Sequence, residues 1–322
     1  MSAQASGAPS PAQVRRGLLL GFVGVVIFAM TFPMTRLAVG DVSAPQMSPA
    51  FVTAARAALA GLLSIVYLRW VGASVPARRH WAPLAVCAAG TVVGFPLCIA
   101  LALCEVEAMH AAVVTGIIPL GTAVVGALWL RQRPSAGFWL CALAGCALVL
   151  GFAVWKGGGR LVPADGWLLL AVLSTAIAYV AGARVSSVIP AQQVICWVVV
   201  GSLPLTLPAT LWWWPVGTSP SLAAWGGLLY VGLFSMWLGF FAWYGGLALG
   251  GIVRVSQVQL LQPFLALLFA VPVLSERLDP VTLGFALAVI AIVFVSRRMP
   301  VGKPAQAPSD ARRSDGRPPT AS

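Results

Sequence analysis

Few side chains in this sequence can do chemistry away from water, because its long apolar segments carry almost no charge. Arg56 is the one charged residue well inside such a segment. Counting from Ser48 at about 1.5 Å per residue places it roughly 12 Å deep, near the middle of an apolar layer of about 30 Å. We therefore predict that Arg56 faces a wet cavity. Its guanidinium group either anchors an anionic group such as a carboxylate or bonds to backbone carbonyls and braces the helices.

Uncharged polar residues recur at helical spacing near the end of the chain. Ser256, Gln259 and Pro263 follow an i, i+3, i+7 pattern, which puts them on one helical face with Gln262 beside it. Such a stripe suits hydrogen bonds to a substrate or hydrogen bonds between helices. With aromatic residues added as cavity lining, the predicted substrate-binding residues are Arg56, Thr115, Tyr179, Trp197, Trp243, Tyr244, Gln259 and Gln262.

A second polar group surrounds Pro119, which we expect to kink its helix and free a carbonyl. Thr115 and Thr122 flank this proline, and His110 lies close to the outer end of the same apolar segment. A histidine can titrate near neutral pH, and it can equally be a structural residue.

The motifs of known catalytic sites are missing from the sequence. There is no G-x-S-x-G or H-E-x-x-H pattern and no pair of carboxylates inside an apolar segment. The six cysteines form no C-x-x-C pair and read as small apolar residues. We predict neither an enzyme nor a metal or cofactor site.

Composition predicts the elements that must position these residues. Of 322 residues, 60% are hydrophobic and 9% are charged, against about a quarter charged in soluble domains. About 20 helical residues cross a bilayer core. The fold class predicted is therefore an all-α membrane protein with ten transmembrane helices, placed at 17–35, 48–67, 81–104, 111–130, 134–155, 166–183, two between 185 and 253, 255–275 and 280–296.

The net charge of +12 follows the topology of these spans. With the N-terminus in the cytoplasm, fifteen basic residues lie in inner segments and only Arg36, Lys156, Arg160 and Arg277 lie in outer ones. This is a strong positive-inside bias. Six of the eight acids are predicted in outer loops, namely Asp41, Glu105, Glu107, Asp165, Glu276 and Asp279. The basic balance therefore indicates membrane orientation, and we predict no nucleic-acid partner.

Landmarks repeat at a spacing of 144 residues along the chain. An odd number of spans per copy would place the second copy upside down in the membrane, as in many transporters. The predicted organisation is a disordered cytoplasmic N-terminus (1–16), a five-helix repeat (17–155), a linker (156–165), an inverted five-helix repeat (166–298) and a disordered cytoplasmic tail (299–322). The landmark pairs are Trp81 with Trp225, Pro119 with Pro263, and Arg133 with Arg277.

The chain resembles the EamA-type ten-helix permeases of the drug/metabolite transporter superfamily. The matching residues are Pro49-Ala50-Phe51 followed by Arg56, then Leu261-Gln262-Pro263, Ser275-Glu276-Arg277-Leu278 and Gly284. In the first half the family's acidic residue in the corresponding short loop is replaced by Gln132. The resemblance implies export of amino acids, their relatives and other small metabolites from the bacterial cytoplasm, often by exchange with protons.

We therefore expect a multi-pass carrier in the bacterial inner membrane, with a small-molecule substrate and protons as a candidate coupling ion. Two other functions stay open at this point. One is an exporter of drugs or lipophilic cations, for which a cationic Arg56 is poorly suited. The other is a membrane assembly protein that transports nothing.

Overall fold

The computed structural model describes residues 11–129, 133–186, 188–250, 255–299 and 301–302. The regular secondary structure of the described chain is helical, apart from one pair of two-residue strands and an isolated bridge between Gly40 and Pro45. Its first half holds α1 (Pro11–Ala29), α2 (Thr31–Val39), α3 (Pro49–Trp70), η1 (Arg78–His80), α4 (Trp81–Ala88), η2 (Ala89–Gly94), α5 (Phe95–Glu105), α6 (Ala108–Thr115), α7 (Ile118–Trp129), β1 (Arg133–Pro134) and α8 (Ala136–Lys156). Its second half holds α9 (Pro163–Ser186), α10 (Ala191–Trp212), α11 (Leu222–Tyr230), η3 (Val231–Leu238), α12 (Gly239–Gly250), η4 (Ser256–Leu261), α14 (Gln262–Leu274), α15 (Pro280–Arg298) and β2 (Val301–Gly302).

Consecutive elements join into long apolar segments. Eight of these are long and apolar enough to cross a membrane, and two shorter apolar ones follow at Val258–Leu274 and Pro280–Ser296. The charge-free stretch between 185 and 253 is divided as predicted, with a turn between α10 and α11. Large apolar side chains such as Leu205 and Leu211 are about three-quarters exposed, which suits contact with lipid. The chain is thus a multi-pass membrane protein.

Several helices begin where a side chain caps their free backbone N–H groups. Ser48, the N-cap of α3, accepts from Phe51 N at 3.2 Å, and Pro49 follows at the first helical position. Ser135 caps α8 and Asp279 caps α15 in the same way. Such caps are worth about 1 kcal/mol each, so local sequence determines where these helices start.

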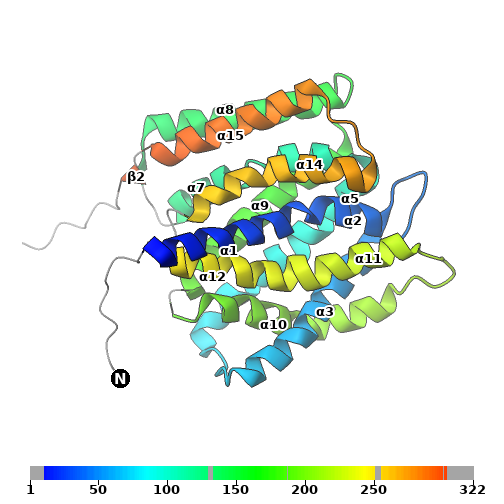
Figure 1. The fold of residues 1–322 in the computed structure, drawn as a ribbon, viewed down its shortest axis with the longest axis vertical. Coiled ribbons are helices and arrows are strands. Elements are labelled where there is room, and N and C mark those ends of the chain that lie inside the picture. The colour runs from blue at the N-terminus through cyan, green and yellow to red at the C-terminus, as the bar shows by residue number, and fades with distance from the viewer. Residues whose placement is uncertain (1–10, 130–132, 187, 251–254, 300, 303–322) are drawn as a thin grey trace, which may run out of the picture.

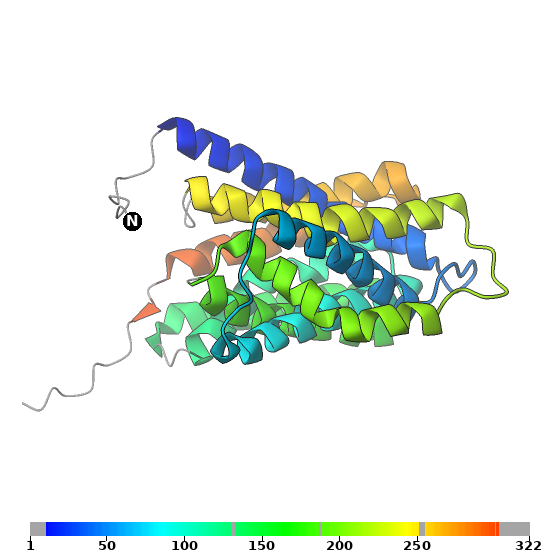
Figure 2. The ribbon, with the colours of Figure 1, turned by 90° about the horizontal axis from the view of Figure 1, so that it is seen from below.

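The closest helix packing joins the two halves of the chain. In Figures 1 and 2, α1 lies along α12 and α3 lies along α10, while α8 and α15 form a separate layer at the top of Figure 1. The α4, η2 and α5 segment packs on α9, and α6 packs on α14. Each of these pairs takes one helix from before residue 156 and one from after residue 163. The two halves are therefore interleaved as a single bundle.

Glycines bring α1 and α12 close together. A Cβ atom added at Gly246 would lie 2.6 Å from the backbone nitrogen of Gly21, a distance that real Cβ atoms do not reach. Without strong hydrophobic driving force between helices in lipid, small residues at the contact allow extensive van der Waals packing. This contact fixes α1 beside the second half.

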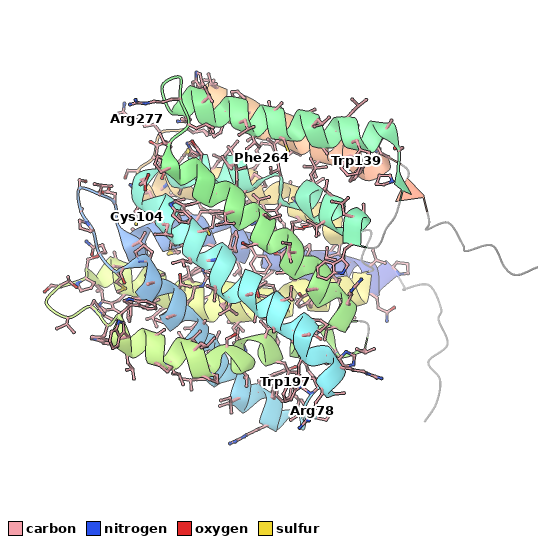
Figure 3. All side chains as sticks on the ribbon, turned by 180° about the vertical axis from the view of Figure 1, so that it is seen from behind. Arg78, Cys104, Trp139, Trp197, Phe264 and Arg277 are labelled. Atoms are coloured by element: carbon pink, nitrogen blue, oxygen red, sulfur yellow. The ribbon has the colours of Figure 1, made fainter. Side chains whose placement is uncertain are left out.

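The bundle has two distinct ends. We call the end with segments 40–48, 213–221 and 275–279 the loop end, and it lies at the right in Figure 1. At the opposite end, called the terminal end, α1 begins and α15 is followed by β2, which pairs antiparallel with β1. Figure 3 shows Arg277 and Trp139 at opposite ends of the α8 and α15 layer. The turns at 133–134 and 275–279 therefore lie at opposite ends of the bundle.

Three predicted boundaries need correction. Helix α1 begins at Pro11, so residues 11–16 are helical although a disordered terminus was predicted there. Helix α9 begins at Pro163, which shortens the predicted 156–165 linker. The strand pair places Val301–Gly302 against the turn before α8, inside the predicted disordered tail. At the start of α9 the added turn is packed, because Ala164 and Asp165 are buried, and in the tail the order follows from strand pairing.

Candidate functional site

A cavity of about 80 Å³ lies among the helices, enough for several water molecules. Elements from both halves of the chain supply its walls, which combine aromatic side chains with hydroxyl, amide and guanidinium groups. The lining residues are Phe28, Thr31, Phe32, Arg56, Thr91, Phe95, Ala112, Thr115, Gly116, Ile118, Pro119, Thr175, Tyr179, Ser235, Met236, Phe240, Gln259, Gln262 and Pro263. Concave sites with apolar walls and a few convergent polar groups are typical of small-molecule binding.

Arg56 is the most buried charge on this wall, with 3% of its surface exposed. Its Nη2 donates to the Ser235 hydroxyl at 3.0 Å, and its Nε has no hydrogen-bond partner among the described residues. Thr31 Oγ1 donates to the same Ser235 oxygen at 2.8 Å. Ser235 therefore accepts two hydrogen bonds and links α2, α3 and η3 around the guanidinium group.

Three threonines on the cavity wall are satisfied within their own helices. Thr91 donates to Cys87 O at 2.7 Å, Thr115 to Ala111 O at 2.7 Å, and Thr175 to Ala171 O at 2.8 Å. A hydroxyl that donates to its own helix still has oxygen lone pairs to offer. These residues therefore serve the cavity as hydrogen-bond acceptors.

The cavity wall repeats the spacing of 144 residues. Thr31 and Thr175, Thr91 and Ser235, Thr115 and Gln259, and Pro119 and Pro263 all stand 144 positions apart, and all eight line the cavity. The π-helical segments η2 and η3 also occupy corresponding places, since 89–94 shifted by 144 falls within 231–238. Local π geometry inside α-helices often occurs at functional sites. The two halves thus contribute matching polar groups to one cavity.

Five of the eight predicted binding residues come together in this cavity. They are Arg56, Thr115, Tyr179, Gln259 and Gln262, and their role in binding substrate stays a prediction. Residues 256–261 form a 3₁₀-helix, in which positions three apart share a face. Gln259 in this helix and Gln262 at the start of α14 both line the cavity, and the side chain of Ser256 lies outside the described residues.

The other three predicted residues do not line the cavity. Trp197 packs in an apolar cluster with residues of α3, α4 and α10, and Figure 3 shows it at the lower edge of the bundle. Trp243 packs on α1, where a Cβ atom added at Gly24 would lie 3.1 Å from the Trp243 Cβ. Tyr244 packs against Phe240 with ring centroids 5.8 Å apart. All three are partly buried, and the prediction that they line the cavity is wrong.

Sequence reasoning missed Thr31, Thr91, Thr175 and Ser235, four residues whose hydroxyl groups belong to the cavity wall. A signal for them was present. Two pairs among these four residues stand at the same spacing of 144 that relates the other landmarks. Searching every polar residue at that spacing would have found all four.

His110 belongs to a buried pair outside this cavity. Its Nε2 lies 2.8 Å from Asp165 Oδ1, and both residues are almost fully buried. Asp165 Oδ2 accepts from Val162 N at 2.9 Å. The prediction that Asp165 lies in an outer loop is wrong, because it sits in the first turn of α9 and packs inward. Within the described residues no three His, Cys, Asp or Glu side chains gather as a metal site.

Ion pairs link several segments at the loop end. Lys156 contacts Glu107 at 3.4 Å and Asp279 at 3.2 Å, and Arg36 contacts Asp41 at 3.2 Å. Glu276 accepts hydrogen bonds from the backbone nitrogens of Ala108 at 2.7 Å and Met109 at 2.9 Å, at the N-terminus of α6.

The environments of two loop-end carboxyl groups shift their pKa values in opposite directions. Burial raises the pKa of Glu276 above its ordinary value, against the effect of the two backbone hydrogen bonds. Burial also acts to raise the pKa of Asp279, but hydrogen bonds from Thr282 and Lys156 outweigh it and lower that pKa to about 2. The loop between α14 and α15 is therefore tied to α6 by one carboxylate and to α8 by another.

Comparisons with known proteins agree with this architecture. The model of the EamA-like transporter family matches residues 15–154 and again residues 162–297. A Bacillus subtilis (strain 168) protein named "Uncharacterized transporter YdeK" is 43% identical over 286 residues, covering 88% of this chain and 97% of the relative. A solved structure described as "Crystal structure of protein" matches with a TM-score of 0.58 at 18% identity, over 88% of this chain and 98% of the other, and so shares the fold.

Proposed function

The chain belongs to the EamA-like transporter family, and from this premise we propose that it exports a small metabolite, an amino acid or a relative of one, by alternating access. It is a membrane transporter by family, and the family and the named relative point to transport and not to catalysis. The observation that carries the proposal is the cavity among helices of both halves, whose largely apolar wall carries a guanidinium group, two amides and several hydroxyl groups.

An inverted arrangement of two five-helix halves is part of this proposal. It is supported by the turns 133–134 and 275–279 at opposite ends of the bundle, by packing that joins the two halves, and by matched cavity residues 144 positions apart. Binding at the interface of inverted repeats lets one half rock against the other around a fixed site.

Orientation follows from the basic residues. We place the terminal end in the cytoplasm and the loop end outside, in a bacterial inner membrane, in line with the positive-inside bias. Reporter fusions after Arg133 and after Arg277 should then score on opposite sides of the membrane. The same side for both would contradict the inverted arrangement.

Arg56, Thr115, Tyr179, Gln259 and Gln262 are the residues we propose to bind substrate. A guanidinium fork and two amides offer directional hydrogen bonds, and the phenylalanines of the cavity offer apolar contact. Transport requires that such a site be reachable from each side in turn.

The test is transport by the purified, full-length protein in proteoliposomes, with amino acids and their acylated forms as substrates. We expect accumulation that saturates with concentration and is absent from empty vesicles. Thr175→Phe, which fills the cavity, should reduce it at least about tenfold. Thr210→Phe is the matched control, since Thr210 lies on α10 away from the cavity, and it should leave transport unchanged.

Each comparison must use equal amounts of folded, reconstituted protein. If no compound accumulates above the empty-vesicle level, the transporter assignment at this site is wrong. If both phenylalanine variants behave alike, transport does not pass through this cavity.

A further inference from the structure

The charge of Arg56 is not balanced by any described carboxylate. The six described acids lie elsewhere: Asp41, Glu107, Asp165 and Asp279 are paired with Arg36, Lys156 or His110, Glu276 binds the N-terminus of α6, and Glu105 is exposed. None of them lines the cavity. The only other acids in the sequence are Asp310 and Asp315, in the segment 303–322 that the structure does not describe. A cation thus faces a cavity whose described walls hold no anion.

Hydrogen bonding to Arg56 is also incomplete. A guanidinium group has five N–H donors in a fixed fork, and the one side chain seen to accept from Arg56 is Ser235. The Nε donor is buried and has no partner among the described residues. Leaving a charged donor buried and unpaired is costly. An anion with two oxygens would neutralise the charge of Arg56 and accept hydrogen bonds from the N–H groups of the guanidinium that lack a partner.

The rest of the cavity wall suits a ligand that is uncharged outside its anionic group. Phe28, Phe32, Phe95 and Phe240 supply apolar surface, and Gln259 and Gln262 supply amides that can exchange hydrogen bonds with an acyl-amide group. In a free amino acid the ammonium group stands on the carbon next to the carboxylate. Binding the carboxylate at Arg56 would therefore hold the ammonium close to the guanidinium, with no described carboxylate nearby to compensate it.

We infer that the cavity selects small monoanions whose remainder is uncharged, such as carboxylates without a free amine, over free amino acids and over cations. This rests on the proposed function and narrows its substrate class. A bound monoanion brings the charge of the site to zero, whereas a zwitterion leaves one positive charge and a cation leaves two. The preferred ligand is thus an N-acylated or deaminated relative of an amino acid.

One molecular skeleton can carry all four charge states. Phenylalanine is a zwitterion, N-acetylphenylalanine an anion, phenylalaninamide a cation and N-acetylphenylalaninamide neutral, and the glycine series repeats the set at smaller size. Binding to the purified full-length protein is measured by calorimetry, and transport is measured in proteoliposomes. We expect the N-acetyl anion to bind at least about tenfold more tightly than the zwitterion and the neutral amide, the effect of one charge-assisted hydrogen bond.

Two substitutions separate substrate recognition from structural support. Arg56→Gln should remove the preference for the anion, bringing anion and neutral amide within about twofold of each other. Arg56→Lys should keep part of the preference, because it keeps the charge and loses the fork. Arg36→Gln is the matched control, because Arg36 is already paired with Asp41 at the loop end, and its order of preference should equal that of the wild type.

The outcomes are distinct. Tighter binding of the zwitterion or the cation, or equal losses for all four ligands in Arg56→Gln, would overturn the inference. Failure of both series to bind the wild type would also overturn it, while transport of any other compound by the same vesicles would leave the proposed function standing.

Discussion

The cavity and the loop end handle charge in opposite ways. At the loop end, Lys156 lies within 3.4 Å of two carboxylates and Arg36 pairs with Asp41, all with side chains between 18% and 52% exposed. In the cavity, Arg56 is 3% exposed and its acceptor is a neutral hydroxyl. Partly exposed ion pairs contribute little to stability, whereas a buried charge without an acid is costly. The loop-end charges are thus paired with acids, whereas the cavity charge has only a neutral partner among the described residues, as the proposed anion site requires.

The pair of His110 and Asp165 combines features of both regions. It is buried, as Arg56 is, and its members are paired with each other, as the loop-end charges are. It joins α6 to α9, and the His110 ring also packs on Phe152 of α8 at 5.2 Å between centroids. Because this pair is buried, we expect it to contribute more to the stability of the fold than any loop-end ion pair does. It lies outside the cavity, so we expect no effect on which ligand binds.

The largest stability effect is therefore expected from Asp165→Ala. It leaves His110 and the Val162 N–H group buried without a hydrogen-bond partner, which should lower the free energy of unfolding by about 3 kcal/mol. Thermal unfolding in detergent measures it, with Asp165→Asn as a milder companion that keeps an acceptor for Val162. The double variant His110→Ala with Asp165→Ala should cost clearly less than the sum of the single changes. Simple additivity would show that the pair is not coupled.

A smaller effect is expected from Glu276→Ala. This change removes both acceptors from the N-terminus of α6, and the loss of such a cap costs about 1 kcal/mol. Because burial raises the folded pKa of Glu276, the folded state favours its protonated form, so its contribution to stability falls as the pH rises above 4.5. Glu276→Gln should flatten that pH dependence. An unchanged pH profile in the glutamine variant would contradict the assignment.

The smallest effect concerns Asp279, whose pKa is lowered from 3.8 to about 2. A lowered pKa means that the ionised form stabilises the fold above pH 3.8 and that this stability is lost as the pH falls toward 2. Asp279 is one-third exposed, so solvent screening leaves about 1 kcal/mol. Asp279→Asn should remove this acid-dependent loss in unfolding measured between pH 2 and 5. If the stability of the wild type does not decrease as the pH is lowered from 5 to 2, the predicted role of ionised Asp279 is wrong.

The sequence predicted a large part of the fold from hydropathy and charge. Apolar segments long enough to cross a bilayer and the division of the charge-free stretch into two helices follow from local rules. The same local reasoning placed Arg56, Thr115, Tyr179, Gln259 and Gln262 among polar residues with apolar neighbours, and the structure gathers these five around one cavity. Local reasoning did not predict the π-helical segments η2 and η3 or the 3₁₀-helix η4, because these depend on packing within the bundle.

By itself the sequence determined which residues are too polar to face lipid and which stretches must be helical, because both depend on the transfer of single side chains and on helix length. Only the tertiary structure decided their partners. Trp197 packs in a cluster with residues of α3 and Trp243 packs on α1, while Tyr244 contacts Phe240 of its own helix. Asp165 points inward because His110, 55 residues earlier, lies opposite it. Glu276 reached the N-terminus of α6 across 168 positions of the chain. Helical periodicity specifies a face, but the neighbour of that face is set by packing between distant segments, which spacing along the chain does not encode.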